Sequence, residues 1–488
     1  MNAPLPLAAW LGRGGDDRIA MDPGGANAYG CPPHPVAGGL VFASCTASPP
    51  SPRAFAAAGD LHRRLGLDHA AGLSPQRYAS ELERLRSELT LQLGLAGLPG
   101  LGIIFGASGT DLHLFAAQLG DDGTAPLRVF MPEAAETGGG IPAALAGRHA
   151  RPRAAQAGAV TLGSPIGGGR VQAVVALALR GPDGRPRPPD AVDDELERGV
   201  LATVGQGWRA LVVLADQSKT GLVGPDPSVA LALQRRFPGR VELLVDACQG
   251  RLRPASLRRH LSQGLLVALT GSKFMGGPAF SGALLVPGPA ARRLSRHALP
   301  AGLADYSGRA DWPPDWPGAA ALPPAANPGL LLRWEAALAE WGALRALDET
   351  ALRAALAPAA DAIAARLRTD PALEALEVPA RPPDPEAPGA DWDRVQTVFP
   401  FLARRRGAAL PPQEAARLWR DLGASGCRLG QPITCARPDG EPASALRLSL
   451  GLPHALEALN PLGQGPAALV TDAMRALDRV VETLNRPS

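Results

Sequence analysis

The chain has 488 residues, of which 46% are hydrophobic, and this length allows two or three domains with substantial cores. Its formal net charge is only +3 and its longest basic run covers residues 404–406, so a nucleic-acid-binding surface is not expected. No apolar run reaches the roughly 18 residues that a membrane span needs, and no export signal is evident. Five cysteines without zinc-type spacing favour a reducing, cytoplasmic setting and no metal site.

The basic residues are distributed unevenly between two types. Only Lys219 and Lys273 are lysines, and the other 47 are arginines. Arginine therefore supplies the surface charge, and it stays protonated, whereas a lysine amine can lose its proton and attack a carbonyl. We expect at least one of the two lysines to be a working amine; the alternative is that both are present by chance.

Short apolar runs alternate with helix-like patterns through the first 290 residues. Strands are predicted at 101–106, 127–131, 171–179, 210–216, 241–247 and 265–271. Helices are predicted between the later strands, at 227–237 and 255–264. This alternation is typical of an α/β domain with a mainly parallel central sheet flanked by helices, whose active edge lies at the carboxyl ends of the strands.

Two proline-rich stretches, 311–328 and 378–390, are predicted to be loops. An amphipathic helix is predicted directly after the first, and later strands near VQTVFPFL and ALRLSLGL complete a smaller C-terminal α+β domain. The predicted organisation is an N-terminal segment near the active site (1–35), a large α/β domain (36–310), a linker (311–328) and a small domain (329–488).

The stretch GASGTD (106–111) joins a predicted strand to a predicted helix. Free N–H groups at the start of a helix, together with the hydroxyls of Ser108 and Thr110, suit a phosphate dianion. The alternative is an ordinary helix cap, with Thr110 or Asp111 as the capping residue.

Two further features follow strands of the same sheet. Asp246 ends the strand VELLVDA with Gln249 three residues later, and Lys273 follows the strand LLVALTG. A buried carboxylate needs a cationic partner, such as a protonated pyridine nitrogen, although Asp246 alone could equally cap the next turn. A phosphate cradle, a carboxylate for a ring nitrogen and an amine for an aldehyde are together what pyridoxal phosphate (PLP) needs.

With these three features together, the chain resembles the fold-type I PLP-dependent enzymes of the class V aminotransferase family, which includes cysteine desulfurases and kynureninase-like lyases. VDACQ is similar to the family's Asp-x-x-Gln motif, and TGSK to its Ser/Thr-x-x-Lys motif. GGPAFSGALLV (276–286) resembles the glycine-rich strand after that lysine, and GASGTD stands at the phosphate-binding turn. MDPGGAN and ALRLSLG resemble the family's entry segment and late arginine strand.

The resemblance implies a role for each matched residue. Lys273 would form the Schiff base with the cofactor, and Asp246 would keep the pyridine nitrogen protonated. Gln249 would approach the 3-oxygen of the ring. Arg447 would clamp the substrate α-carboxylate, unless it is a strand arginine that faces solvent. The phosphate would be held by Ser108, Gly109, Thr110 and Thr270.

The chain departs from the family pattern at two places. The turn that usually stacks a flat side chain on the cofactor ring reads PEAAETGGG, so Glu136 or Thr137 would occupy that place. The loop that carries the nucleophile of desulfurases corresponds to 423–435, where Leu429 stands at the cysteine position and Cys427 lies nearby. An inert thiol is the favoured interpretation of Cys427, which argues against desulfuration.

Other residues are candidates for cofactor or substrate contact. Lys219 is a rival for the Schiff base, but no ring-binding acid or glycine-rich strand accompanies it, so we assign it to substrate binding, with Ser218 in the same turn at the cofactor. Asn27 and Tyr29 are candidate substrate contacts in an irregular loop that could equally be structural. Arg333 could reach a substrate acid, although a helix-surface arginine is the default.

These features predict a cytoplasmic, homodimeric PLP enzyme that acts on an amino acid or amine, with transamination as the favoured reaction. A lyase, a C–C bond-forming enzyme or an epimerase of the same family is the first alternative. A non-catalytic PLP-binding or regulatory protein is the second. A nucleotide-binding α/β protein is a third, although the chain lacks the usual GxGxxG fingerprint. Neither nucleic acid nor a membrane is expected as a partner.

Overall fold

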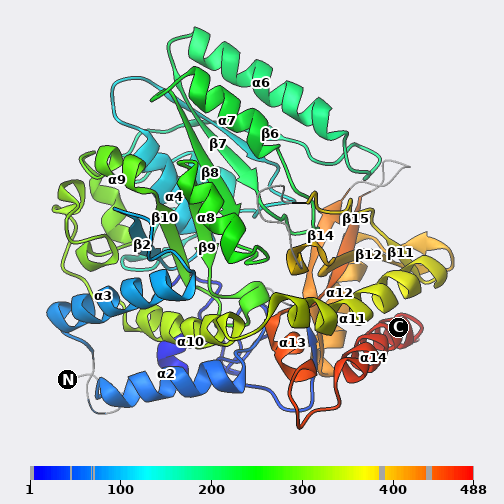
Figure 1. Ribbon diagram of the computed structural model, residues 1–488. Coiled ribbons are helices and arrows are strands. Elements are labelled where there is room, and N and C mark those ends of the chain that lie inside the picture. The colour runs from blue at the N-terminus through cyan, green and yellow to red at the C-terminus, as the bar shows by residue number, and fades with distance from the viewer. Residues whose placement is uncertain are drawn as a thin grey trace.

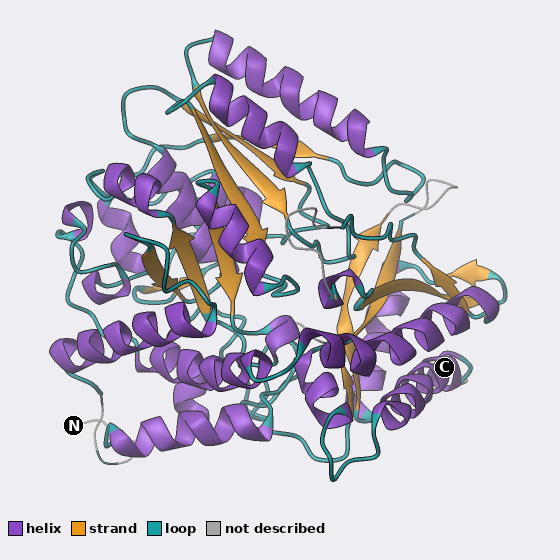
Figure 2. Cartoon of the chain, in the orientation of Figure 1, coloured by secondary structure: helices purple, strands orange, loops and turns teal. Residues whose placement is uncertain are grey.

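The computed structural model describes residues 5–43, 47–67, 69, 72–383, 391–435 and 442–486. Two β-sheets lie side by side, each with helices packed around it (Figures 1 and 2). Both the α/β class and the separate smaller α+β region predicted from the sequence are present. No helix in these described ranges is long and apolar enough to cross a membrane.

The larger sheet has seven strands in the order β2-β10-β9-β8-β7-β3-β6. The five strands from β9 to β6 run parallel, and β10 is antiparallel to both of its neighbours, β9 and β2. Their bounds are β2 Gly102–Gly106, β3 Leu127–Pro132, β6 Ala173–Leu177, β7 Arg209–Ala215, β8 Val241–Ala247, β9 Leu266–Thr270 and β10 Gly282–Val286. The six predicted strands all form, and their ends differ from the predicted bounds by at most two residues.

Helices cover both faces of this sheet (Figure 2). Alternate residues of β8 show it: Leu243 and Val245 pack in the core that includes α6, α7 and α8, whereas Leu244 packs in the core that includes α4 and α9. The strands are mostly apolar because both faces are buried, as expected of parallel sheets; the charged residues of β7 and β8 lie at or near the strand ends. The helix bounds are α4 Gly109–Gly120, α5 Ile141–Leu145, α6 Pro189–Gly205, α7 Pro227–Arg236, α8 Pro254–Ser262 and α9 Gly288–Leu294.

A layer of helices lies below the larger sheet in the view of Figure 1. It consists of α1 Leu7–Leu11, α2 Pro52–Arg64, α3 Pro75–Gln92 and α10 Pro328–Arg345. Helix α10 was predicted to be amphipathic, but it is buried on nearly all sides because it packs against α1, α2 and α3 and against the turn after β9.

The smaller sheet has the strand order β1-β14-β15-β12-β11, with β13 paired to β12. Its strands are β1 Leu40–Phe42, β11 Leu373–Ala375, β12 Val398–Arg405, β13 Ala408–Ala409, β14 Cys427–Cys435 and β15 Ala443–Ser449. The surrounding helices are α11 Glu349–Thr369, α12 Pro412–Ala424, α13 Leu452–Ala458 and α14 Pro466–Leu484. A two-stranded ribbon, β4 Arg153–Ala154 with β5 Gly158–Ala159, lies apart from both sheets.

Three segments differ from the sequence predictions. Residues 423–435, expected to be a loop, end α12 and then form β14, which pairs with β1 and β15 around a bulge between Gly430 and Ile433. Strand β1 lies in the range proposed for the large domain but pairs with β14 of the smaller sheet. The predicted linker 311–328 packs on the core of the larger sheet through Trp312 and Trp316, because an indole buries enough apolar surface to hold an irregular segment in place. Of the second proline-rich stretch, residues 384–390 lie outside the described residues.

Candidate active site

The predicted phosphate turn begins α4. The Ser108 hydroxyl accepts a hydrogen bond from the Asp111 N–H (3.2 Å), and the Asp111 carboxylate accepts one from the Ser108 N–H (3.1 Å). This capping box makes Ser108 the helix cap and Asp111 its partner, which corrects the alternative that Thr110 or Asp111 is the cap. Within the described chain, the N–H groups of Gly109 and Thr110 have no hydrogen-bond partner, so they remain available to an anion.

Gly109 brings this helix start against the ends of β8 and β9. A Cβ atom at Gly109 would lie 2.9 Å from the Cys248 sulfur and 3.8 Å from the Thr270 methyl group. Only glycine allows this close approach without a shift of Cys248. The Thr270 hydroxyl donates to the Cys248 carbonyl (2.6 Å), so its proton is already used and it could offer only lone pairs to a ligand.

Asp246 lies near the carboxyl end of β8 and is buried. One carboxylate oxygen accepts from the Cys248 N–H (3.1 Å), and the other lies 3.5 Å from His113 Nε2. His113 is fully buried on α4, where its Nδ1 donates to the Gly109 carbonyl at 2.7 Å. The imidazole therefore links the acid on β8 to the phosphate turn.

Lys273 follows β9 in a short 3₁₀ turn, η1 (Lys273–Met275), with a positive φ of 63°. A non-glycine residue in this region carries backbone strain, which is common at functional sites. The turn is pressed against α10: a Cβ at Gly271 would lie 2.3 Å from the Ala337 side chain, and one at Gly277 would lie 2.9 Å from the Ala337 backbone. The glycines around Lys273 thus permit close packing that fixes where the lysine begins.

The residues predicted to cover the cofactor ring interact mainly with the protein itself. Glu136 is buried, forms an ion pair with Arg180 (3.0 Å) and accepts hydrogen bonds from the Ser218 hydroxyl (2.5 Å) and the Thr220 hydroxyl (2.7 Å). The Thr137 hydroxyl donates to the Glu133 carbonyl (3.2 Å). Glu136 and Ser218 are thereby joined in one network that holds the turn after β7.

Lys219 lies in that same turn, near Lys273 and Arg447. The Lys219 N–H donates to the Glu136 carbonyl (2.8 Å), and the Arg447 guanidinium donates to the Lys219 carbonyl (3.4 Å). Burial, followed by the charges of Arg447 and Lys273, lowers the pKa of Lys219 to about 7. Lys219 thus lies close enough to Lys273 and Arg447 for their charges to act on it.

Arg447 is buried on β15, so the alternative of a solvent-facing strand arginine is wrong. Its guanidinium also donates twice to the Gln431 carbonyl, at 3.0 and 3.2 Å. Gln249 is buried as well, with its side-chain oxygen accepting from Arg251 (2.8 Å), which leaves its amide N–H groups for another partner.

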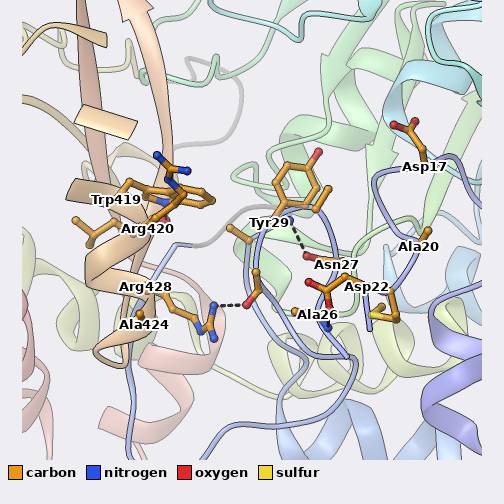
Figure 3. Close-up of a pocket in the computed structure, with 16 residues that line it drawn as sticks. Asp17, Ala20, Asp22, Ala26, Asn27, Tyr29, Trp419, Arg420, Ala424 and Arg428 are labelled. Atoms are coloured by element: carbon orange, nitrogen blue, oxygen red, sulfur yellow. Dashed lines mark hydrogen bonds between the residues drawn. The ribbon is translucent and has the colours of Figure 1, made fainter. Parts of the chain in front are cut away.

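Asn27 and Tyr29 line a cavity of about 610 Å³ between the N-terminal segment and the α12–β14 corner (Figure 3). Trp419 and Arg428 form its opposite wall, and neither lysine lines it. The Asn27 side-chain oxygen accepts from the backbone N–H groups of Tyr29 (2.9 Å) and Cys31 (3.1 Å), so it shapes the loop. Lys273 lines a different cavity, of about 810 Å³, against α13 and α14.

Two other interpretations are settled by burial. Arg333 is not on the helix surface; it is fully buried and donates to the carbonyls of Phe280 (2.8 Å), Leu11 (3.1 Å) and Gly14 (3.0 Å), so it ties the N-terminal segment to α10. Cys427 begins β14 and is buried, and burial raises its pKa to about 11, as expected of an inert thiol.

Sequence reasoning missed Arg18 and His113. Arg18 forms an ion pair with Asp16 (2.5 Å) and lies over the ring of Phe280, and its charge contributes to lowering the pKa of Lys219. No pattern marks it, because its segment is irregular. His113 could have been found, since it stands four residues after Gly109 and therefore on the same helix face.

The chain matches no known family model and no curated protein sequence. Its fold is nevertheless similar to that of solved structures. The cystine C–S lyase C-DES, in complex with its reaction product cysteine persulfide, aligns with a TM-score of 0.56 and 15% identity, over 93% of this chain and 99% of that chain. The cysteine desulfurase CsdA from Escherichia coli gives 0.53 and 16%, over 91% and 95%.

A third structure, the glutamate decarboxylase domain of a diaminobutyrate-pyruvate transaminase and L-2,4-diaminobutyrate decarboxylase from Vibrio parahaemolyticus, gives a TM-score of 0.55 and 14% identity, over 91% of this chain and 80% of that chain. Another structure of C-DES, with glycine covalently linked to its PLP cofactor, gives 0.57 and 14%, over 92% and 97%. Since these alignments span nearly the whole chain, the protein has the fold of the fold-type I PLP-dependent enzymes.

Proposed function

We propose that the protein is a PLP-dependent enzyme that acts on the amino group of an amino acid or amine, with Lys273 as the lysine that binds the cofactor. The observation that carries the proposal is the convergence of three groups at one sheet edge. The start of α4 reaches the ends of β8 and β9 through Gly109, Asp246 lies at the end of β8, and Lys273 follows β9.

The residues present fit the cofactor chemically. The free N–H groups of Gly109 and Thr110 at the helix start suit the phosphate. Asp246 suits a protonated ring nitrogen, because a buried carboxylate is stabilised by a cation and the hydrogen bond from the Cys248 N–H orients it. When bound, PLP supplies an electron sink for the carbanion formed at the substrate α-carbon.

The chain's own side chains supply the remaining steps. Arg447 would bind the substrate α-carboxylate, a task suited to a guanidinium already oriented by the Gln431 carbonyl. The Lys273 amine would accept the proton of the substrate α-carbon as a general base and would deliver it to C4′ of the cofactor as a general acid. The turn held by Glu136 would line the site on the side of Lys219.

Transamination is the reaction we favour. Cys427 is buried in β14 with a raised pKa, so the chain has no thiol at the place where a desulfurase needs its nucleophile. The lyase and decarboxylase among the structural neighbours make a lyase the second candidate. We also propose a cytoplasmic location, from the five cysteines without zinc-type spacing, and a homodimer, from the family resemblance.

Two experiments test the proposal. Purified protein should be coloured by bound cofactor, and borohydride reduction followed by peptide mass spectrometry should place the cofactor on Lys273. Amino acids that change the absorbance should then be screened for product. A 2-oxo acid without free ammonia indicates transamination, whereas ammonia or carbon dioxide indicates a lyase. Colourless protein that does not bind added PLP contradicts the proposal.

A further inference from the structure

The proposed reaction uses one of the two lysines, yet the structure places both in turns that follow strands of the larger sheet. Lys273 follows β9 and Lys219 follows β7, on either side of β8 and Asp246. The charge of Lys273 acts on Lys219 directly. The chain uses arginine at its other 47 basic positions, yet it has a lysine at position 219, and the proposed reaction gives that amine no chemical step.

Lys219 is held from two sides through its backbone. Its N–H donates to the Glu136 carbonyl (2.8 Å), and its carbonyl accepts from Arg447 (3.4 Å). The flanking residues Ser218 and Thr220 donate to the Glu136 carboxylate at 2.5 and 2.7 Å. The turn is therefore anchored, and the root of the Lys219 side chain is fixed rather than mobile.

Three cationic residues act on the amine of Lys219. In the cofactor-free protein Arg447 on β15, Lys273 in η1 and Arg18 in the N-terminal segment all oppose a positive charge there, and Arg447 and Arg18 remain when Lys273 is bound to the cofactor. Glu136 favours the charge, but it is already paired with Arg180. Within the described chain, no carboxylate forms an ion pair with Lys219. Burial is the main cause of the lower pKa, and these cations add to it, so in the cofactor-free protein the pKa of Lys219 falls to about 7 and the amine exists both free and protonated near neutral pH.

We propose that Lys219 is a second acid–base residue of this site, which accepts the proton of the substrate ammonium group as the substrate carboxylate binds beside Arg447. This inference rests on the proposed function. An amino acid enters as an ammonium ion but reacts as a free amine, so one proton must leave. The N–H bond of the substrate breaks, a new N–H bond forms on Lys219, and the charge moves from substrate to lysine without an oxidant or other co-reactant.

Arg447 couples the two events. While the site holds no anion, the Arg447 charge disfavours a proton on Lys219. A carboxylate that binds to Arg447 offsets this charge and strengthens Lys219 as a base at the moment when the substrate ammonium arrives. Arginine at this position would keep the charge but could not accept a proton.

The titration of Lys219 can be measured directly because the chain contains only two lysines. Full-length protein labelled with ε-¹³C-lysine should give two lysine NMR signals, and Lys219→Arg removes one and so assigns them. We expect the Lys219 signal to titrate near pH 7 and its midpoint to rise by about one unit when propionate is added as the carboxylate probe. A midpoint near 10, or one that propionate does not move, overturns the inference.

Kinetics separate an acid–base role from a charge role. With any amino acid that changes the cofactor absorbance, Lys219→Met and Lys219→Arg should both slow the change roughly 100-fold or more at neutral pH. Added ethylamine should partly restore the rate of Lys219→Met. A Lys219→Arg variant with the wild-type rate would instead show that Lys219 only binds an anion. If the protein binds no PLP, or borohydride does not trap it on Lys273, the proposed function fails, whatever the titration of Lys219 shows.

Discussion

Replacing Lys219 with methionine should stabilise the cofactor-free protein, and the gain should depend on pH. Methionine has a similar length but no charge, and the backbone contacts of Lys219 with Glu136 and Arg447 do not involve the side chain. Lysine has a pKa of 10.5 in the unfolded chain and about 7 in the folded protein, so the unfolded state binds more protons between these values. Folding must therefore release a proton in this pH range, and this release costs free energy.

The magnitude follows from linkage. Removing the cost should raise the free energy of unfolding by at most about 4 kcal/mol at pH 7, about 2 kcal/mol at pH 9, and less than about 0.5 kcal/mol at pH 10.5. Urea denaturation of wild type and Lys219→Met, in buffers without phosphate or sulfate, measures the difference at each pH. A difference that is constant from pH 7 to pH 10.5 would refute the reasoning, because only a shifted pKa produces the slope. Added phosphate should reduce the difference at pH 7, since an anion in the site offsets the neighbouring cations.

Three further outcomes are expected. Gly109→Ala should weaken PLP binding at least about 10-fold in a fluorescence titration, because the new methyl group meets the Cys248 sulfur. Adding Cys248→Ala should restore binding, and a double variant that binds as weakly as the single one would contradict this explanation. Arg333→Met should lower the free energy of unfolding, measured in urea, by about 3 kcal/mol or more, because it leaves several buried carbonyls without a donor. A change below about 1 kcal/mol would show instead that water replaces the guanidinium. Lys273→Ala should remove the cofactor absorbance whereas Lys219→Met should keep it; the reverse result would assign the cofactor to Lys219.

The sequence was most informative where parallel strands end. Asp246 and Lys273 were placed at one edge because each follows a continuous apolar run, and buried parallel strands leave little choice about where their carboxyl ends lie. Only one helix and one strand separate Asp246 from Lys273 in the sequence, so they were expected to lie at the ends of adjacent strands.

The remaining site residues have no such pattern. Arg18 comes from an irregular segment whose position depends on Arg333, a residue more than 300 positions later. Glu136 looked like a substitute for a ring-stacking residue, but the structure gives it three polar partners from the turn after β7 and the segment after β6, and none of these contacts is local in sequence. Strand β14 was expected to be a loop because residues 423–435 correspond to the cysteine-bearing loop of desulfurases. Its pairing with β1 and β15, strands far away in the sequence, makes it a strand instead.

The pairing of β1 with β14 also constrains how the protein is made. Leu40 lies opposite Cys427, so β1 cannot pair with β14 during synthesis until residue 427 has left the ribosome. The larger sheet contains no strand from either end of the chain and can form earlier. Arg447 lies on β15, which pairs with β14, so the side of the site that it forms is also completed late in synthesis. A nascent chain would thus carry Asp246 and Lys273 on a formed sheet before Arg447 was in place, and the proposed carboxylate site would be the later of the two to form.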